Sequence, residues 1–565
     1  MIGEHCKTHY FKYLKDIVAI IVELQDSVTD SNSNDTNQTY LKTALERVCP
    51  HLITDFPDTL EHVLGSVIKL IRNVPKMSLS EKPKEEFSLS ALIFDEDENK
   101  KEKKNISMST SETQDIESSI TLLNTLVEKM GKVYLPFISM SEEVLIPLLC
   151  FYINDEVRIE TCNAFPTMLT VIKNHCSVDD LHIKAKLYIT SILTACDTEF
   201  DNGTLAVFLD NMGTLVEIAG MFLNTQDINS FFEKIMILFD NTEIKRLKLL
   251  ADQKKVLEAP VVKEDINSDD EEEDDDDIRK DFENDIEEIE EIQEYTADII
   301  GKLFKTHKEL TMEMVGKITK DILPKYFRND ASVFEIKMGI FIVDDLIEFL
   351  GQDLLSNIWD DLAKIVIGFN THHSIEIRRA ASYGVGIFAK FTKNNFEKYA
   401  ADCCNCLING LNFQKKESDD DDQFEGAKDN ATSSLGKIIK HQNTNIDLAK
   451  VIPNWLNHLP ILVDLDESEE QHLMLCQIIN NKSSLVIGDD FANLPQVLKI
   501  LARIYQTKKY SNDEIDGLIK GIIQNVLSNP TAKNIMINTR EGLHDKDNKI
   551  KKKLETFISG NLKLI

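Results

Sequence analysis

Three cysteines that lie close together are the first residues whose types could do chemistry. Cys403, Cys404 and Cys406 occur in the stretch DCCNCLING, and thiolates are good zinc ligands. A zinc site also needs a matching pair of Cys or His at a suitable spacing elsewhere in the chain. The nearest histidines are His372 and His373, and no pattern in the sequence brings them to the cysteines. We therefore expect buried thiols, with no metal and no cofactor.

Paired carboxylates are the next candidates. The stretch WDDL places Asp360 and Asp361 side by side. General acid–base catalysis needs a second group at a defined distance, and no such partner is evident, so these two are expected to be surface charges on a helix. The phosphate loop GxxxxGK[ST], GxGxxG after a strand, HExxH and GxSxG are all missing from the sequence. The sequence therefore argues against an enzyme, with a hydrolase or transferase as the weaker alternative.

A long acidic run in the middle of the chain suggests binding rather than catalysis. Residues 264–294 carry nineteen acidic and two basic side chains, a net charge of −17 out of −33 for the whole chain. Nine of the acids are consecutive, and such a block repels itself too strongly for ordered packing. The block consists of Asp269, Asp270, Glu271, Glu272, Glu273, Asp274, Asp275, Asp276 and Asp277. It predicts a flexible loop over residues 259–280, which either holds basic partners or only keeps the chain soluble.

Beyond Asp281 the acids alternate with apolar residues at helical spacing. Phe282, Ile286, Ile289 and Ile292 follow one another at intervals of four, three and three residues, which is typical of one face of an amphipathic helix. Acidic side chains suit the first turns of a helix because its dipole is positive there. We therefore expect a helix that begins at Asp281.

The rest of the chain shows the same helical periodicity. Its 565 residues are 42% hydrophobic and include 21 glycines and 13 prolines, so helices with short connections are favoured. Amphipathic segments come in pairs, which predicts an all-α protein, a right-handed α-solenoid of about ten antiparallel helix pairs of the HEAT type. The expected order is HEAT-like helices in 1–76, a disordered polar insertion in 77–114, HEAT repeats in 115–258, the acidic loop in 259–280 and further HEAT repeats in 281–565.

Three segments show the residue pattern of a HEAT helix, and each is expected to open a helix pair. In these segments an apolar residue and a basic residue precede a small one. The small residue lets neighbouring helices approach closely, while an arginine lies along the seam between repeats and satisfies carboxylates or carbonyls. The residues expected at the seam are Arg158, Arg378, Ala381 and Ala431.

A solenoid of this kind offers an extended concave wall for binding. Acidic side chains on such a wall attract Lys- and Arg-rich segments through many weak, salt-sensitive contacts. For any single carboxylate the alternative is an ordinary solvated charge. The candidate contacts on the concave face are Trp359, Asp360, Asp361, Asn454 and Trp455.

Composition also disfavours several classes of protein. The N-terminus lacks a basic segment followed by an apolar one, so no secretory signal is expected, and no stretch approaches the roughly 18 apolar residues of a membrane span. With 96 acidic and 63 basic residues, the chain lacks the basic surface that binds nucleic acids and suits basic partners instead. We expect a monomer with reduced cysteines in the cytoplasm or nucleus.

The stretch from Gly339 to Phe391 resembles a known family. It contains FIVDDLIE and EIRRAASYGVG, and NATSSLGKIIK, VIPNWLNHLPI and VIGDDFANLPQVLKI follow in order. These segments are similar to the importin beta-3 branch of the karyopherin-beta nuclear transport receptors. Upstream, VLIPLLCFYINDEVRIETCNAFPTML fits as well, and the acidic run falls where that branch has an acidic interruption between repeats. The resemblance covers most of the chain from Ile116 onward.

This resemblance implies HEAT repeats, carriage of basic cargo proteins through nuclear pores, weak contacts with FG-repeat nucleoporins, and release by the GTPase Ran. The chain resembles the C-terminal half of these longer receptors. The N-terminal arch, where the family chiefly binds Ran-GTP, has no counterpart in it, so Ran-GTP binding stays open. The alternative is a HEAT-repeat scaffold subunit of a stable cytosolic or nuclear complex, without transport activity.

Overall fold

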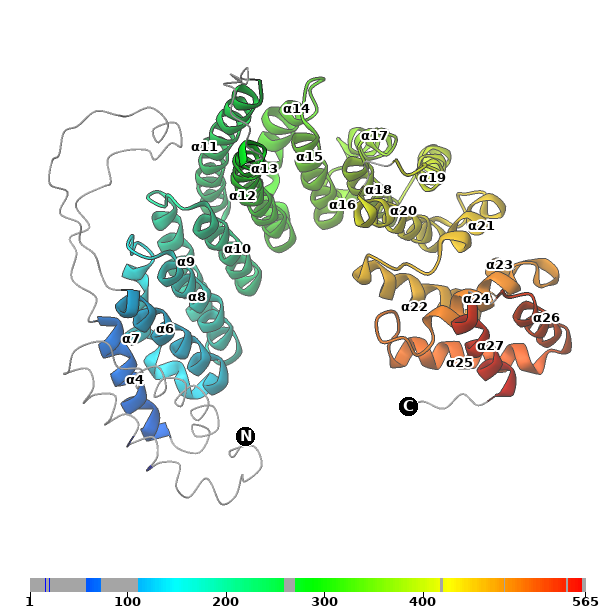
Figure 1. Ribbon diagram of the computed structural model, residues 1–565, viewed down its shortest axis with the longest axis horizontal. Helices are drawn as coiled ribbons and strands as arrows, with labels where there is room; N and C mark the ends of the chain where they lie inside the picture. The colour runs from blue at the N-terminus through cyan, green and yellow to red at the C-terminus, as the bar shows by residue number, and fades with distance from the viewer. Residues whose placement is uncertain are drawn as a thin grey trace. The chain divides into compact units, whose positions relative to one another are not determined.

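The computed structural model describes residues 57–72, 110–258, 270–416, 420–481, 483–544 and 547–560, together with residues 16 and 20. Every regular element in these ranges is a helix (Figure 1). The chain divides into two compact units. Unit 1 comprises residues 1–223 and 233–302, and unit 2 comprises residues 224–232 and 303–565.

The described helices of unit 1 form two layers. In the first layer each helix packs beside the next, and the layer consists of α6 (Thr110–Met130), α8 (Asp155–His175), α10 (Asn202–Ala219) and α12 (Asp270–His307). The second layer consists of α7 (Ile138–Leu148), α9 (Val178–Cys196) and α11 (Thr225–Glu258). In addition, α4 (Pro57–Arg72) packs on α6, and a 3₁₀ segment (Gly131–Phe137) leads into α7.

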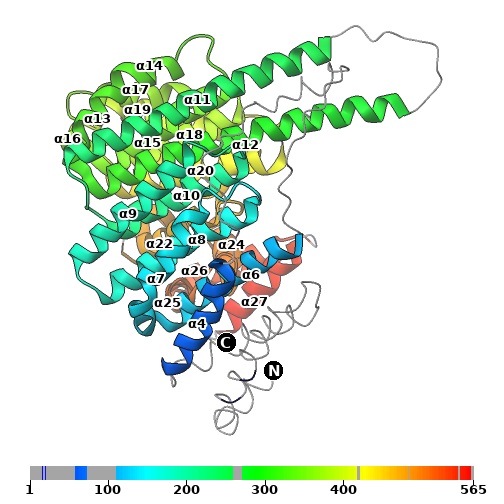
Figure 2. The same ribbon diagram turned by 90° about the vertical axis from the view of Figure 1, so that its left-hand side faces the viewer.

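Two long helices, α11 and α12, lie side by side in this unit. Arg246 on α11 reaches Glu290 on α12 at 3.2 Å, and Gln293 on α12 donates a hydrogen bond of 2.9 Å to Glu243 on α11. Figure 2 shows the C-terminal end of α11 and the N-terminal end of α12 projecting beyond the other helices of unit 1.

Unit 2 repeats the two-layer arrangement. Its first layer consists of α15 (Val333–Asp345) with the π-helical segment Leu346–Leu350, then α18 (Ile375–Phe391), α20 (Asp421–Gln442), α22 (Leu465–Asn481) and α25 (Asp513–Ser528). Its second layer consists of α17 (Trp359–Phe369), α19 (Glu397–Leu411), α21 (Leu448–His458) and α24 (Leu494–Ile504). Shorter or terminal helices are α13 (Met312–Lys317), α14 (Leu323–Tyr326), α16 (Gly351–Leu354), α23 (Ser483–Ile487), α26 (Pro530–Glu541) and α27 (Asn548–Ser559). The remaining segments are 3₁₀ turns at Lys308–Thr311 and Asp489–Phe491 and a π turn at Ile318–Ile322.

Polar caps explain where many of these helices begin. The side chain of Asn154 accepts a hydrogen bond of 2.8 Å from the N–H of Val157 at the start of α8. Ser332 and Glu335 form a reciprocal capping box at the start of α15. Each cap satisfies backbone donors that the first helical turn leaves unpaired. The short connections can therefore turn sharply without leaving buried N–H groups unbonded.

Small residues let the first-layer helices of unit 2 approach closely. A Cβ atom at Gly386 of α18 would collide with the side chain of Ser434 on α20, and one at Gly384 would collide with Asp344. Ala381 is fully buried in a cluster with Ile336, Ile340 and Ile377. The tight α18–α20 and α15–α18 contacts thus depend on side chains no larger than those present.

The predicted all-α HEAT solenoid is confirmed, and three of its expected details are wrong. The acidic helix α12 begins at Asp270 instead of Asp281, so residues 270–280 of the predicted loop are helical. Acids near a helix start interact favourably with the dipole, and Arg279 pairs with Glu283 one turn later at 2.9 Å. The helix α6 begins at Thr110, inside the insertion predicted for residues 77–114.

The third difference concerns the pairing of α18. This helix contains one of the three segments expected to open a helix pair, but it packs more extensively on α17, the helix before it, than on α19, the helix after it. Predicted features in residues 1–56, 77–109 and 259–269 lie outside the described residues, apart from residues 16 and 20. In the described part of the chain, no helix combines the length and the apolar character needed to cross a membrane.

Candidate functional site

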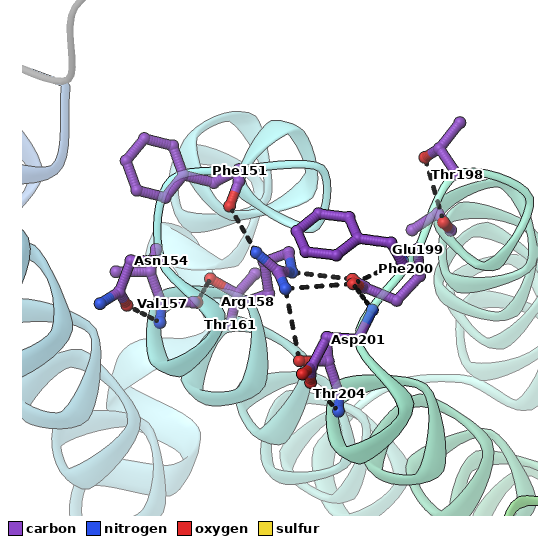
Figure 3. A network of polar contacts seen from close by, with 11 residues as sticks. Phe151, Asn154, Val157, Arg158, Thr161, Thr198, Glu199, Phe200, Asp201 and Thr204 are labelled. Carbon is purple, nitrogen blue, oxygen red and sulfur yellow. Dashed lines mark hydrogen bonds and ion pairs between the residues drawn. The ribbon is translucent and has the colours of Figure 1, made fainter. Parts of the chain in front are cut away.

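A buried ion pair holds α8 against the segment between α9 and α10 (Figure 3). The guanidinium of Arg158 forms hydrogen bonds of 2.7 and 3.0 Å with the two carboxylate oxygens of Glu199, and both side chains are 3% exposed. Arg158 also donates to the backbone carbonyl of Phe151 at 3.0 Å, beyond the end of α7. The ring of Phe200 lies 5.2 Å from the guanidinium. Arg158 therefore ties together the ends of three successive helices.

Glu199 in turn sets up the start of α10. Its Oε1 atom accepts hydrogen bonds of 3.0 Å from the backbone N–H groups of Phe200 and Asp201. Asp201 is the N-cap of α10, and its Oδ1 atom accepts a hydrogen bond of 2.7 Å from the N–H of Thr204. Arg158 thus pairs with Glu199, and Asp201 forms no ion pair with it.

An acidic row crosses the first layer of unit 1. We define it as eight carboxylates contributed by four helices. They are Glu117 on α6, Glu156 and Glu160 on α8, Asp201 at the N-cap of α10, Asp210 on α10, and Glu288, Glu291 and Asp298 on α12. Polar side chains beside the row link one helix to the next. Thr121 on α6 donates a hydrogen bond of 3.0 Å to Glu160, and Asn211 on α10 donates one of 2.9 Å to Asn163 on α8.

Like charges act on one another at the α6–α8 end of the acidic row. Partial burial raises the pKa of Glu117, and the charges of Glu156 and Glu160 raise it further. Glu156 is exposed, and Glu117 and Glu160 are half-buried, so all three residues are reached by solvent. Negative charge therefore accumulates here beyond what the local surface neutralises.

The same effect occurs at the α10–α12 end. Partial burial raises the pKa of Glu288, and the charge of Asp201 contributes to the rise. Burial also raises the pKa of Tyr295, with further increases from the charges of Glu291 and Asp210. The hydroxyl of Tyr295 donates a hydrogen bond of 3.2 Å to Glu291. Carboxylates on two adjacent helices thus lie close enough to repel one another.

Cations do little to offset the acidic row. Lys302 lies 2.6 Å from Asp298, and among the described residues no other lysine or arginine forms an ion pair with a member of the row. Such a surface attracts positively charged segments, and its contacts weaken as salt screens them. The chemistry that the row offers is therefore reversible binding of cations.

The first layer of unit 2 also carries carboxylates, but its lysines offset them. Lys437 pairs with Glu467 at 2.6 Å, with side chains 3% and 13% exposed. Lys440 pairs with Glu470 at 3.3 Å. Glu467 and Glu470 are therefore paired with lysines, whereas among the described residues only Asp298 of the acidic row has such a partner.

The two tryptophans that we expected on a binding face are buried, so that prediction is wrong. Trp359 is 1% exposed, stacks on Phe388 with ring centroids 5.1 Å apart, and donates a hydrogen bond of 3.1 Å to Thr392. Trp455 is fully buried. Large aromatic rings at these positions stabilise the helix layers because burying them removes apolar area from water.

The other expected contacts on that face are engaged locally. Asp360 lies 2.7 Å from Lys398 on α19, and Asp361 lies 2.8 Å from Lys364 one turn later. The half-buried Asn454 donates to a carbonyl of its own helix α21. The structure does not gather these side chains into one site.

The seam residues lie between helices as follows. Arg378 on α18 donates to the backbone carbonyls of His372 and His373 at 2.8 and 3.0 Å, much as Arg158 does to Phe151. Ala381 and Ala431 are buried on α18 and α20. Each arginine therefore fixes the connection that precedes its own helix.

The cysteines Cys403, Cys404 and Cys406 are buried on α19. Burial raises the pKa of Cys404 to about 11 and that of Cys406 to about 12. Thiols of this kind stay protonated near neutral pH, which disfavours metal binding and nucleophilic chemistry. Among the described residues, no three His, Cys, Asp or Glu side chains are grouped so that they could hold a metal ion.

Most of the predicted acidic block, residues 269–277, lies within the described residues. Asp269 lies outside them, and residues 270–277 belong to the first turns of α12. Glu288 and Glu291 fall within the acidic run, but the other members of the acidic row escaped the sequence argument because no long run of acids marks them. The usable signal was weaker: carboxylates at helical spacing on the polar side of α8 (Glu156 and Glu160) and α12 (Glu288 and Glu291).

Comparison with known proteins adds to this picture. No protein-family model matches the chain. Importin subunit beta-3 from Saccharomyces cerevisiae is 22% identical over 529 residues, which covers 91% of this chain and 45% of that protein. The chain thus spans about half the length of this curated relative.

Solved structures share the fold. The karyopherin Kap121p bound to the SUMO protease Ulp1p superimposes with a TM-score of 0.66 at 16% identity, covering 97% of this chain and 46% of that one. Kap121p bound to RanGTP gives the same TM-score, identity and coverage. At this identity the structural likeness bears on the fold alone. The chain is thus similar in sequence to importin subunit beta-3 over 91% of its length and shares the helical solenoid fold of Kap121p.

Proposed function

We propose that this chain is part of a nuclear transport receptor and that the acidic row of unit 1 binds lysine- and arginine-rich segments of cargo proteins. The observation that carries the proposal is the row itself, eight carboxylates on four adjacent helices with one described lysine partner. Similarity to importin subunit beta-3 supports a transport role.

The helix layer suggests how a basic segment would lie on the acidic row. Packed helices are about 8–10 Å apart. An extended peptide advances about 3.3 Å per residue, so a segment that crosses the layer meets a new helix about every third residue. Cargo segments with a lysine or arginine at every third position should therefore match the row best.

The partners of Kap121p support a wider proposal. Kap121p was solved bound to the SUMO protease Ulp1p and bound to RanGTP. We accordingly propose that this chain, too, binds a protein cargo, and that Ran-GTP releases it. The cargo contacts would be ionic and salt-sensitive, whereas Ran-GTP would act as a specific competitor.

Apolar side chains on the second layer of unit 1 suit FG-repeat nucleoporins. The large apolar side chains that are exposed on α9 and α11 are Val178 at 64%, Ile183 at 64%, Leu187 at 39%, Ile237 at 62%, Ile244 at 66%, Leu247 at 51% and Val256 at 43%. Phenylalanine side chains of pore repeats would bury this surface through brief, weak contacts. With such contacts, a monomeric receptor would move between the cytoplasm and nucleus through the pore.

A pull-down tests the proposal. The purified chain is mixed with cell extract at low and at moderate salt, with and without Ran-GTP. Basic nuclear proteins and FG-repeat nucleoporins should be recovered, and moderate salt or Ran-GTP should release the basic proteins. The double variant Glu156→Lys with Glu160→Lys should lose the basic proteins and keep the nucleoporins. Recovery of one fixed complex, insensitive to salt and Ran-GTP, would instead favour a scaffold subunit.

A further inference from the structure

We propose that a cavity in unit 2 binds a short acidic segment with an aromatic side chain, a partner opposite in charge to the cargo proposed above. The cavity has a volume of about 620 Å³ and lies between the end of α14, the second half of α17 and the connection from α17 to α18. Figure 1 locates these helices. This volume falls in the range of pockets that hold small ligands or a few side chains.

One side of the cavity is aromatic. The rings of Phe327 and Phe369 lie 5.1 Å apart at 33°, and Ile365 lines the cavity beside them. Phe327 and Phe369 also pack against buried core residues such as Ile340, which holds them in place. A third ring could add to this pair at the 4.5–7 Å separations that aromatic side chains favour.

Gly368 keeps this side open. It is exposed on α17, and no atom lies within 4 Å of the place where its Cβ would be. A larger side chain at this position would enter the cavity without touching the core. Gly368 therefore offers a way to fill the cavity by mutation.

The other side of the cavity is polar and carries no acid. Lys364, His372 and His373 line it, and none of the described side chains that line the cavity is a carboxylate. The two imidazole rings lie 4.1 Å apart. In a chain with 96 acidic residues and a net charge of −33, a surface without carboxylates is unusual and admits an anion.

Arg378 adds positive charge behind this side. Its guanidinium donates to the carbonyls of His372 and His373 at 2.8 and 3.0 Å, which fixes the connection in place. Burial lowers the pKa of His372, and the charges of His373 and Arg378 lower it further, as expected where the potential is positive. At neutral pH a neutral imidazole can still donate one N–H to a carboxylate.

Lys364 is available to a partner at little cost. It pairs with Asp361 at 2.8 Å, but the two side chains are 75% and 71% exposed. Exposed pairs of this kind contribute little, so an incoming carboxylate can replace Asp361. The proposed partner places an aromatic ring beside Phe327. It directs a carboxylate at Lys364 and the two imidazoles, so it contacts both sides of the cavity.

The test compares three labelled peptides by fluorescence anisotropy with the full chain: SDFES, its neutral counterpart SNFQS and the ringless SDAES. We expect SDFES to bind about tenfold more tightly than either of the others, because a charge-assisted hydrogen bond and a buried ring are each worth about that factor. The Lys364→Met variant should reduce the preference for SDFES over SNFQS.

Gly368→Leu should abolish binding of SDFES, while the matched control Gly368→Ala should bind it within about twofold of the unchanged chain, since one methyl leaves the cavity open. Circular dichroism would show that the Gly368→Leu variant is folded. Retained binding of a lysine-rich peptide would show that its acidic row is intact, which separates this test from the test of cargo binding. Equal affinity for SDFES and SNFQS, or SDFES binding that Gly368→Leu leaves unchanged, would overturn the proposal.

Discussion

Replacing Arg158 with methionine should destabilise unit 1 strongly. The change removes the cation of a pair whose side chains are both 3% exposed and leaves the carboxylate of Glu199 buried. Breaking a buried pair by removing one partner costs about 3–5 kcal/mol. The N–H groups of Phe200 and Asp201 still donate to Glu199, so we expect the lower end of this range, about 3 kcal/mol.

Two further variants separate the buried charge from simple loss of contacts. Replacing both Arg158 and Glu199 with methionine should cost less than the single change, because no uncompensated charge remains. The matched control is Arg72→Met, which breaks a pair with Glu143 at 3.3 Å whose side chains are 55% and 69% exposed. Exposed pairs contribute about 0–1 kcal/mol, so the control should be nearly neutral.

The assay combines denaturant unfolding with hydrogen exchange. Repeat proteins can unfold in parts, so exchange of the Phe200 and Asp201 amides reports on the connection between α9 and α10 directly. Both amides should exchange faster in Arg158→Met, and their exchange rates should be unchanged in Arg72→Met. If the two variants were equally stable and exchange at these amides were unaltered, the role assigned to Arg158 would be refuted.

Three other predictions concern charge, packing and the acidic helix. Burial raises the pKa of Asp344, and the charges of Asp345 and Glu348 raise it further, so the charged carboxylate destabilises the folded chain and this effect disappears as pH falls through the folded pKa. Asp344→Asn should therefore raise the melting temperature at pH 7 and change it much less near pH 5; the lowered pKa values of His372, His441 and His472 act in the opposite direction but are common to both chains. An equal effect at the two pH values would contradict this. Ala381→Phe should cost about 1–3 kcal/mol by overpacking a fully buried position, and an unchanged denaturation midpoint would argue against the α15–α18 packing. Deleting residues 270–294 should lower helicity and reduce the free energy of unfolding by at least about 3 kcal/mol, because Ile289 and Ile292 on α12 are 1% and 0% exposed. Full helicity per residue and an unchanged denaturation midpoint would show that this part of α12 packs on nothing.

The helical repeat architecture was predictable because apolar spacing repeats along the chain. Arg158 and Arg378, which we expected at the seams, both donate to carbonyls of the connection that precedes their helix, since an arginine at that point of a helix can reach it. Local sequence was enough for these features.

The site was less predictable because it depends on which helix faces lie side by side. Trp359 and Trp455 have the residue type of binding anchors, yet burial against neighbouring helices decides their role. Glu160 and Asp210 are separated by 50 positions in sequence and belong to the same row because α8 and α10 pack together. The acidic run drew attention by its charge density, while this row depends on tertiary packing.

The most direct test of the central claim is the affinity of a lysine-rich peptide, with lysine at every third position, for charge-reversed variants at two salt concentrations. Glu160→Lys with Asp210→Lys in unit 1 should weaken binding by more than about tenfold and flatten its salt dependence, because two attractive charges become repulsive. The reversal Glu470→Lys in unit 2, where Lys440 already pairs with the acid, is matched to Glu160→Lys alone and should have a much smaller effect than that single reversal. Equal losses from the two reversals, or no loss from the first, would contradict the assignment of cargo binding to the acidic row.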